Sequence, residues 1–363
     1  MDHPSDSDLM RQWLKELVLI ESPSGHVEGI RRVMETLAQQ LDGLGRVRWE
    51  ETDAGPILDI SRGSGGVLLL GHADTVWPVG TLERMPWRDE GERVYGPGCL
   101  DMKAGLVLGM AAIRALPDDV PFRFLVTPDE EVGSEASRTA IEEAAQLAPL
   151  VLVLESAMAD GAIKVGRAGV GDYRLVVHGI QSHAGLEPEK GASAIRELAR
   201  QILWLEGLEQ KVLGTTLNVG VVAGGTRGNV VAETAEAQID VRITTRSEMD
   251  RIRRTLKAPP RYDARCQVEY RGDINRPPME PNADSAVWVE RADHIWQAIF
   301  GKPLLGVRVG GASDGNFTAP LTPTLDGLGA VGEGPHAQSE SVEWRWMEPR
   351  RQLIGQLMQE ARR

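Results

Sequence analysis

Short apolar runs alternate with amphipathic helical segments through the first 155 residues. The apolar runs have the length of buried strands and are residues 57–60, 67–70, 122–127 and 150–154. The segments with apolar residues at helical spacing are residues 7–20, 27–41, 102–116 and 134–147. Strands that alternate with helices in this way predict an α/β fold, with a mostly parallel sheet covered by helices on both faces.

The pattern changes after residue 168. The elements expected there are strand 173–178, helix 192–208, strands 216–222 and 235–244, helix 247–256 and strand 266–270. This order, β-α-β-β-α-β, is typical of a ferredoxin-like unit. Pro277 and Pro278 then interrupt the chain, and the α/β pattern resumes with a helix at 285–300, short strands at 307–309 and 324–326, and a last helix from about Pro349.

We therefore expect two domains. The first comprises residues 1–167 and 278–363, and the second is an insertion of residues 168–277. A chain of 363 residues is long enough for both.

Charge and composition narrow the possible partners. The chain has 40 basic and 53 acidic residues, and a net charge of −13 argues against a general binder of nucleic acid. No apolar run approaches the ~20 residues of a membrane span. The N-terminus shows neither a basic segment nor an apolar core, so no signal peptide is visible. Cys99 and Cys266 form no paired motif. We expect a cytoplasmic protein without a nucleic-acid or membrane partner.

A histidine and a carboxylate emerge where the apolar run 67–70 ends. His72 could bind a transition metal through one ring nitrogen, and Asp74 could hold the other nitrogen and fix the tautomer. Ligands of open α/β sheets bind outside the carboxyl ends of the strands, which is where this pair lies. The alternative is a simple hydrogen-bonded turn, because a His-x-Asp pair alone is a weak motif.

Four further stretches place acids or histidine at predicted strand ends and loops. The residues concerned are Asp101, the run Asp129-Glu130-Glu131, Glu155 and His336. Singly, each has an ordinary explanation: Asp101 as a helix N-cap, the acids as partners of the next helix's positive end, Glu155 as a solvated strand end and His336 as a surface histidine. Together, two histidines and three carboxylates at one sheet edge would suit zinc, and a carboxylate such as Asp101 can bridge two metal ions.

These stretches resemble the signatures of the M20 family of metallopeptidases, specifically its glutamate carboxypeptidase-like branch. The similar motifs cover nearly the whole chain in order. They are Gly-His-Ala-Asp-Thr-Val at 71–76, Gly-Pro-Gly-Cys-x-Asp-Met-Lys-Ala-Gly at 96–105, Asp-Glu-Glu-x-Gly-Ser at 129–134, Ser-His-Ala-Gly at 182–185 and Gly-Gly-Ala-Ser-Asp-Gly-Asn at 310–316. The resemblance implies a zinc-exopeptidase-like mixed sheet with an inserted ferredoxin-like domain that acts as lid and dimerisation domain.

The resemblance also implies a centre of two zinc ions, replaceable by cobalt or manganese. Asp101 would bridge the ions. His72 and Glu155 would complete the protein ligands of one metal, and Glu131 and His336 those of the other. Glu130 would be the general base that takes a proton from the attacking water, with Asp74 orienting His72.

The same resemblance implies that the inserted domain recognises the substrate. His183 resembles the residue that stabilises the tetrahedral oxyanion, often from the partner subunit, although a lone histidine is commonly structural. Asn229 and Arg242 resemble a pair that binds the substrate α-carboxylate, whereas an isolated strand arginine is often only an exposed charge. Gly311 lies in a loop that resembles the lining of the substrate side-chain pocket. A homodimer through the inserted domain is expected.

The resulting expectation is a zinc-dependent exopeptidase that cuts an amide or peptide bond next to a carboxylate-bearing amino acid. The alternative within the family is a deacylase of the acetylornithine deacetylase or succinyl-diaminopimelate desuccinylase kind. A non-catalytic binding protein is a third hypothesis, which the complete ligand set and the presence of Glu130 disfavour. The stretch after His336, Ala337-Gln338-Ser339-Glu340, departs from many relatives and leaves the shape of the neighbouring pocket open.

Overall fold

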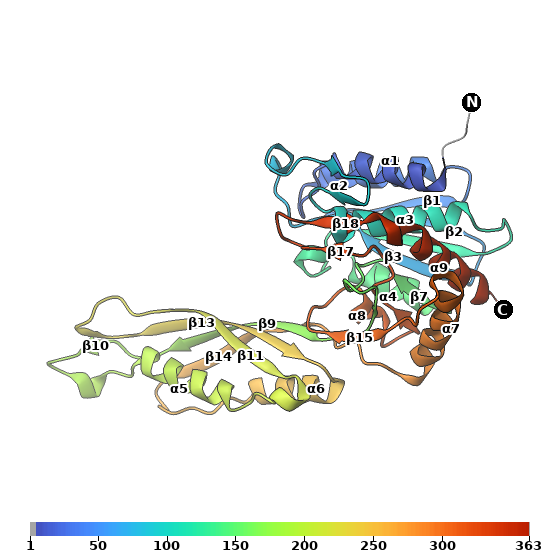
Figure 1. Ribbon diagram of the computed structural model, residues 1–363. Helices are drawn as coiled ribbons and strands as arrows, with labels where there is room; N and C mark the ends of the chain where they lie inside the picture. The colour runs from blue at the N-terminus through green and yellow to red at the C-terminus, as the bar shows by residue number, and fades with distance from the viewer. Residues whose placement is uncertain (1–4, 363) are drawn as a thin grey trace. The chain divides into compact units, whose positions relative to one another are not determined.

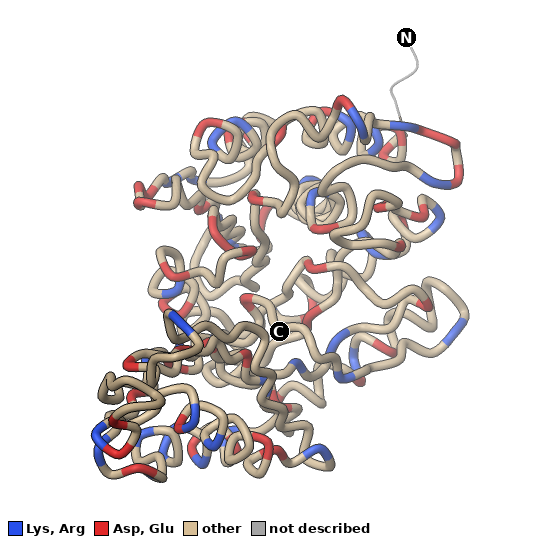
Figure 2. The backbone as a smooth tube through the Cα atoms, turned by 90° about the vertical axis from the view of Figure 1, so that its left-hand side faces the viewer, with Lys and Arg blue, Asp and Glu red and all other residues tan. Residues whose placement is uncertain are grey.

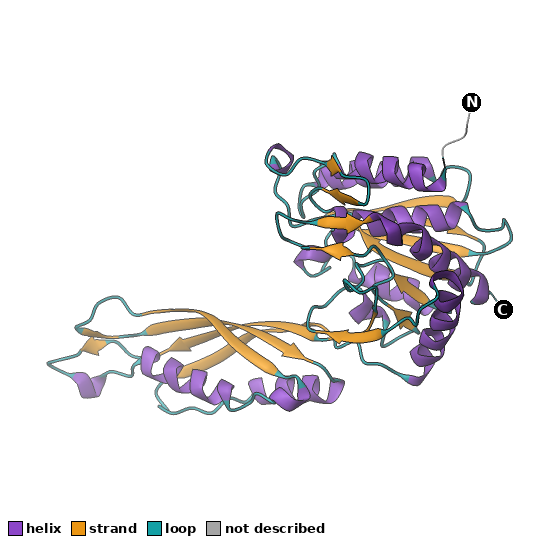
Figure 3. Ribbon diagram, in the orientation of Figure 1, coloured by secondary structure: helices purple, strands orange, loops and turns teal. Residues whose placement is uncertain are grey.

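The computed structural model describes residues 5–362 and divides them into two compact units. The first contains residues 5–166 together with Pro281–Arg308 and residues 313–362, and the second contains Arg167–Glu280 with Val309–Ala312. The short segment Val309–Ala312 therefore groups with the second unit, although the expected insertion did not include it. Figure 1 labels the elements and Figure 3 colours them by type.

A six-stranded mixed sheet forms the centre of the first unit, in the order β1-β2-β6-β3-β7-β16. Its strands are β1 (Arg46–Thr52), β2 (Gly55–Arg62), β3 (Val67–His72), β6 (Phe122–Thr127), β7 (Val151–Val153) and β16 (Thr324–Leu325). The four strands β6, β3, β7 and β16 are parallel, whereas β1 and β2 add an antiparallel edge. The expected α/β class is confirmed, and the sheet is mixed.

Helices cover both faces of this sheet because alternate residues of its strands point to opposite sides. Leu69, Phe124 and Leu152 face one core, shared with α1 (Asp6–Val18), α2 (Val27–Gln40), α3 (Ala104–Arg114), α7 (Ala283–Phe300) and α9 (Met347–Glu360). Leu68, Leu125 and Val153 face the other, shared with α4 (Arg138–Gln146) and α8 (Gly315–Thr318).

Two smaller sheets complete the first unit. One has the order β17-β18-β5-β4 and consists of β4 (Arg88–Asp89), β5 (Arg93–Tyr95), β17 (Gly332–Glu333) and β18 (Ser341–Glu343). The other pairs β8 (Ile163–Arg167) with β15 (Gly306–Val309). Most of these strands are too short and too polar to show a period in the sequence, and none except β15 was expected.

The second unit has the expected order of elements. Its four-stranded antiparallel sheet runs β11-β13-β9-β14, and the chain order is β9 (Gly169–His178), α5 (Ala194–Glu206), β11 (Thr216–Gly224), β13 (Thr234–Ile243), α6 (Arg246–Leu256) and β14 (Gln267–Arg276). A small pair, β10 (Ser182–His183) with β12 (Val230–Val231), lies beyond the main sheet. One core, which includes Leu175, Leu198, Ile239 and Ile252, holds the sheet to its helices.

Several boundaries differ from the sequence-based expectation. The helix expected from residue 134 begins at Arg138, because Asp129 accepts hydrogen bonds from Ala136 N and Ser137 Oγ and holds the preceding residues in a turn. The last helix begins at Met347, before Pro349. None of the helices within residues 5–362 combines the length and the apolar character needed to cross a membrane.

Positions of basic and acidic residues are interspersed along the backbone tube in Figure 2. Over the whole sequence, 53 acidic residues outnumber 40 basic ones.

Helix α3 packs unusually close to the end of strand β7. A Cβ atom added at Gly105 would lie 2.0 Å from the carbonyl oxygen of Leu154, and one at Gly109 would lie 2.8 Å from the Leu154 side chain. The backbone of α3 therefore approaches the segment leading to Glu155 at a distance that only glycine permits.

We expect Gly105→Ala to lower the free energy of unfolding by at least about 1–3 kcal/mol, because the added methyl group must displace backbone. Gly355 in α9 is the matched control: a Cβ there meets no atom within 4 Å. Gly355→Ala should leave stability unchanged or raise it by up to about 1 kcal/mol, as helix propensity predicts. Urea denaturation of both variants measures the difference, and equal midpoints would contradict the close approach.

Candidate metal centre

The candidate ligands gather at the carboxyl edge of the parallel strands. His72 is the last residue of β3, the pair Glu130-Glu131 follows β6, and Glu155 follows β7. Because β6, β3 and β7 are adjacent and parallel, these strand ends meet at one edge of the sheet. All of these residues lie in the first unit, as do Asp101 and His336.

Asp101 lies between the two candidate histidine ligands. Its Oδ1 is 3.4 Å from Nε2 of His72, and its Oδ2 is 3.3 Å from Nε2 of His336. Each histidine faces a second carboxylate: Glu155 Oε1 is 3.2 Å from His72 Nε2, and Glu131 Oε2 is 3.3 Å from His336 Nε2. The structure thus brings together the five residues that the sequence suggested, arranged as two His-carboxylate groups that share Asp101.

This arrangement fits a divalent metal. Among the described residues, Nε2 of His72 and Oε1 of Glu131 are buried without a hydrogen-bond partner, although polar atoms in protein interiors are nearly always bonded. Ligand atoms of His72, Asp101 and Glu131 lie within 4.8 Å of one another, and so do those of His72, Glu130 and Glu155. Imidazole nitrogen with carboxylate oxygen is a donor set that zinc accepts.

The electrostatics of the candidate ligands favour a positive charge at this site. Burial opposes protonation of His72, but the neighbouring Asp101, Asp74 and Glu155 outweigh it and raise its pKa well above the ordinary value. The Asp101 and Glu131 carboxylates raise the pKa of His336 to about 10. Burial raises the pKa of Glu131 to about 7. The converging carboxylates thus favour positive charge at this edge of the sheet, and a metal cation would supply such a charge.

Asp74 does more than orient His72. Its Oδ1 lies 3.3 Å from Nδ1 of His72, whose closest acceptor is the Asp74 backbone oxygen at 2.9 Å. The same carboxylate accepts hydrogen bonds from the backbone N–H groups of Glu130 and Glu131, both at 3.1 Å, and from Ser24 Oγ at 2.7 Å. Asp74 therefore fixes the segment of His72 against the segment of Glu131. The two bonded residues, Asp74 and Glu131, are 57 positions apart, and nothing in the sequence indicated this contact.

Glu130 is buried and lies close to candidate ligand atoms. Its carboxylate is within 4.8 Å of the ligand atoms of His72 and Glu155. This distance suits a general base acting on a water at the metal, and it is also short enough for direct metal binding. The two roles have different consequences, which the test of Glu130 below separates.

The second unit carries the residues expected to recognise the substrate. Nδ1 of His183 accepts hydrogen bonds from the backbone N–H groups of Gly185 and Leu186, both at 3.1 Å. In the neutral ring the proton therefore resides on Nε2, which makes that atom a donor. Asn229 lies beside His183, because its backbone oxygen accepts a bond from Ala184 N at 3.0 Å and Val230 pairs with His183 in the sheet.

Arg242 lies at the opposite end of strand β13 from this pair. It is opposite Thr216 and Val170, whereas Thr234, at the start of the strand, pairs with His178. At ~3.3 Å per residue, Arg242 is roughly 25 Å along the strand from Thr234, and Asn229 lies beyond that. Arg242 also binds the Asp240 carboxylate, with Nη2 2.8 Å from Oδ2. Within one chain, Asn229 and Arg242 therefore do not come together on one carboxylate.

Gly311 lies in the segment grouped with the second unit. Its carbonyl oxygen accepts a bond from Nη1 of the buried Arg167 at 3.2 Å, and a Cβ at this position would meet no atom within 4 Å. The loop is open there, so close packing within the protein does not require a glycine at position 311.

Two buried carboxylates that support the site were missed by the sequence analysis. Asp314 accepts hydrogen bonds from Thr127 Oγ1 at 3.2 Å and from Ser134 Oγ, on either side of the Glu130-Glu131 turn. Glu340 accepts four N–H bonds, three of them from the turn that contains Asp101. The Gly-Gly-Ala-Ser-Asp-Gly-Asn motif was the available signal for Asp314, and the unusual stretch after His336 was the signal for Glu340.

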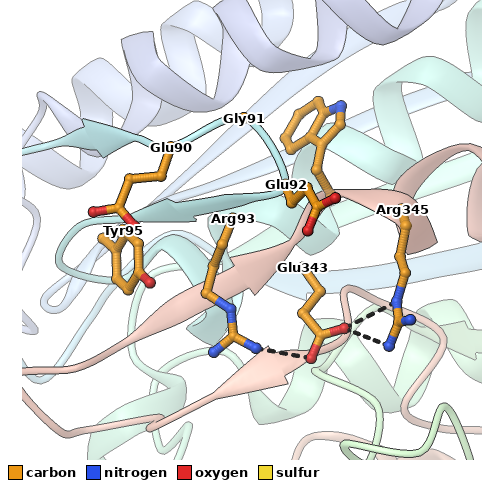
Figure 4. Close-up of a pocket in the computed structure, with 8 residues that line it drawn as sticks. Glu90, Gly91, Glu92, Arg93, Tyr95, Glu343 and Arg345 are labelled. Atoms are coloured by element: carbon orange, nitrogen blue, oxygen red, sulfur yellow. Dashed lines mark hydrogen bonds and ion pairs between the residues drawn. The ribbon is translucent and has the colours of Figure 1, made fainter.

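A pocket of about 780 Å³ lies away from these ligands, on the small sheet of β4, β5 and β18. Figure 4 shows Arg93 and Arg345 both directed at Glu343 within it. Its arginines pair with carboxylates, and it contains no residue of the metal cluster. The candidate metal ligands therefore lie at the sheet edge and not in this pocket.

Candidate metal ligands at the carboxyl edge of an α/β sheet suit a metal-dependent hydrolase, and comparison with known proteins identifies the family. Residues 68–360 match the model of peptidase family M20/M25/M40, so the chain belongs to this family. Peptidases and deacylases of this kind hydrolyse peptide or amide bonds, and the protein is such a hydrolase. The resemblance seen in the sequence motifs is thus confirmed.

Individual relatives span its peptidase and deacylase members. The chain is 29% identical over 340 residues to carboxypeptidase G2 of Pseudomonas sp. (strain RS-16), covering 89% of this chain and 82% of the relative. It is 25% identical over 389 residues to acetylornithine deacetylase of Aliivibrio fischeri (strain MJ11), covering 99% of both chains. The crystal structure of aminopeptidase PepT from Bacillus cereus has the same fold, with a TM-score of 0.79, 22% identity and coverage of 98% and 99%.

We expect Asp74→Asn to weaken metal binding by about 10–100-fold, because an amide cannot accept the Glu130 and Glu131 N–H bonds with both of its polar atoms. Titration of the metal-free variant with Zn²⁺ measures the loss. Ser24→Ala is the control, since it removes one donor to Asp74 and leaves the carboxylate in place. Equal zinc affinity in Asp74→Asn and Ser24→Ala would contradict the positioning role.

Proposed function

We propose that the protein is a two-zinc exopeptidase that cuts the amide bond next to a carboxylate-bearing amino acid, as carboxypeptidase G2-like enzymes do. The observation that carries the two-metal part is Asp101, which presents one oxygen to each histidine. That geometry is what a bridging carboxylate requires. Zinc bound there would lower the pKa of a water molecule and polarise the scissile carbonyl group.

The chain's own groups would then perform the proton transfers. Glu130 takes a proton from the attacking water and delivers it to the leaving amine. Its buried position near the ligand atoms supports this role. His183, whose Nε2 carries the proton in the neutral ring, donates to the oxygen that becomes negative during attack.

The deacylase activity is the second candidate. The similarity to acetylornithine deacetylase, which extends over 99% of both chains, favours it, whereas the higher identity to carboxypeptidase G2 favours the exopeptidase. A panel that varies the acyl group and the amino acid independently, with metal-loaded enzyme, separates the two. Turnover restricted to acetyl or succinyl groups on basic or diamino acids would decide for the deacylase.

We also propose that the protein is a homodimer joined through the second unit. Strand β11 is the edge of its sheet, and Val221 and Val222 on it are 52% and 56% exposed. Leu203 of the adjacent helix α5 is 67% exposed. An unpaired edge with exposed apolar residues suits pairing with a second copy. Because Asn229 and Arg242 cannot meet within one chain, a shared carboxylate would need one of them from each subunit.

Glu130→Gln should lower kcat by about 10²–10⁴-fold and leave the bound zinc unchanged, because the amide cannot accept the proton. Elemental analysis of the variant accompanies the kinetics. Glu135→Gln, an exposed position five residues further along, is the control and should match the unaltered enzyme. If Glu130→Gln loses zinc together with activity, Glu130 is a ligand and its assignment as base is wrong.

Mixing two inactive variants tests whether His183 acts across the dimer. Glu130→Gln and His183→Ala should each be inactive alone. A mixed dimer contains one site with an intact Glu130 and a partner-derived His183, so random exchange should restore about a quarter of the activity. Activity in the mixture is measured after subunit exchange. If His183 acts within its own chain, no activity returns.

A further inference from the structure

Glu340 is a buried carboxylate with no exposed surface, four residues after His336. Its Oε1 accepts the backbone N–H groups of Leu100 at 2.8 Å and Asp101 at 3.0 Å. Its Oε2 accepts Gly98 N at 2.8 Å and the indole Nε1 of Trp77 at 2.7 Å. Both oxygens are therefore saturated by donors.

Three of these four donors belong to one turn. The N–H groups of Gly98, Leu100 and Asp101 converge on Glu340, which gives the turn the character of a backbone nest that binds an anion. Gly98 has a φ of +69°, and a Cβ there would lie 2.5 Å from Thr75 Cγ2. The turn is thus held by an internal carboxylate on one side and by close packing against the His72 loop on the other.

Glu340 connects three segments that carry candidate metal ligands. Trp77 follows His72, the nest contains Asp101, and Glu340 itself closes the loop that begins at His336. The loop is tied at this end, since Glu340 N donates to Ala337 O at 2.9 Å. Among the hydrogen bonds described for residues 5–362, the bond from Asp101 N to Glu340 is the one that joins the His336 loop to the backbone of Asp101.

We propose that Glu340 is a positioning residue that sets the Asp101 carboxylate between His72 and His336. The inference rests on the proposed metal centre. Asp101 must direct one oxygen to each histidine, and the contacts of 3.4 and 3.3 Å leave little room for displacement. A bond to the backbone N of Asp101 controls the origin of that side chain, so its loss affects both contacts together.

Glutamine at position 340 tests this proposal, because it has the size of glutamate but only one acceptor oxygen in place of two. Whichever way the amide turns, its NH₂ group faces N–H donors on one side. Metal-free Glu340→Gln, titrated calorimetrically with Zn²⁺ alone, should bind zinc about 10–100-fold more weakly than the unaltered protein. At saturating zinc, kcat should return to nearly the unaltered value, because Asp101 and Glu130 are intact.

Glu343→Gln is the matched control. Glu343 lies on the same β-hairpin and also accepts an indole N–H, from Trp346 at 3.2 Å, but its other partners are Arg93 and Arg345 (Figure 4). This variant should bind zinc like the unaltered protein. Equal zinc affinity in both variants overturns the proposal. So does a lower unfolding midpoint of metal-free Glu340→Gln with unchanged zinc affinity, since that result defines a merely structural role.

If Glu340→Gln does not fold, Glu340→Asp replaces it, because the shorter side chain keeps the charge and retracts from the nest. Weaker zinc binding in Glu340→Asp supports the proposal, and unchanged binding overturns it. The titration needs no substrate, so its failure leaves the proposed hydrolysis standing. Conversely, weakened zinc binding in a protein that cleaves no substrate of the panel would refute the proposed function alone.

Discussion

The sharing of one carboxylate by two histidines is the constraint on which the rest of the first unit depends. Asp101 can face both His72 and His336 only if its own turn, the end of β3 and a loop more than 230 residues later are held in fixed relation. Buried carboxylates provide that relation. Asp74, Asp314 and Glu340 each accept hydrogen bonds from segments that carry or flank candidate ligands.

These supporting acids differ chemically from the candidate ligands. Nε2 of His72 and Oε1 of Glu131 lack hydrogen-bond partners, whereas the oxygens of Glu340 are fully occupied by N–H donors. A saturated carboxylate cannot easily offer a lone pair to a metal ion. The hydrogen bonds of the acids near the site therefore distinguish carboxylates that can bind a metal from carboxylates that fix the neighbouring segments of the chain.

The order of parallel strands was sufficient to place three candidate ligands at one edge of the sheet, whereas the full set of five was implied by the family resemblance. His72, Glu131 and Glu155 each follow an apolar run, so position along the chain translated directly into position in space. The supports could not be predicted in the same way. Glu340 accepts a hydrogen bond from Asp101 N across 239 residues. Backbone N–H donors are common to nearly all residue types, so the sequence does not reveal such a bond.

The fold divides similarly. Long periodic elements were predictable, whereas β4, β5, β17 and β18 are too short to show a period. The spacing of Asn229 and Arg242 suggested a joint role, but the register of β13 separates them within one chain. The number of residues between two positions gives only the length of chain between them. In an extended strand, residues that are many positions apart are also far apart in space.

The division of the chain into two units has a consequence for how such an enzyme can diversify. Every candidate metal ligand belongs to the first unit, and His183, Asn229, Arg242 and Gly311 belong to the second. With the roles proposed above, substitutions that alter the choice of substrate would fall in one unit and leave the metal ligands of the other unchanged. Exchanging the second unit between relatives would then change the specificity and keep the hydrolytic reaction.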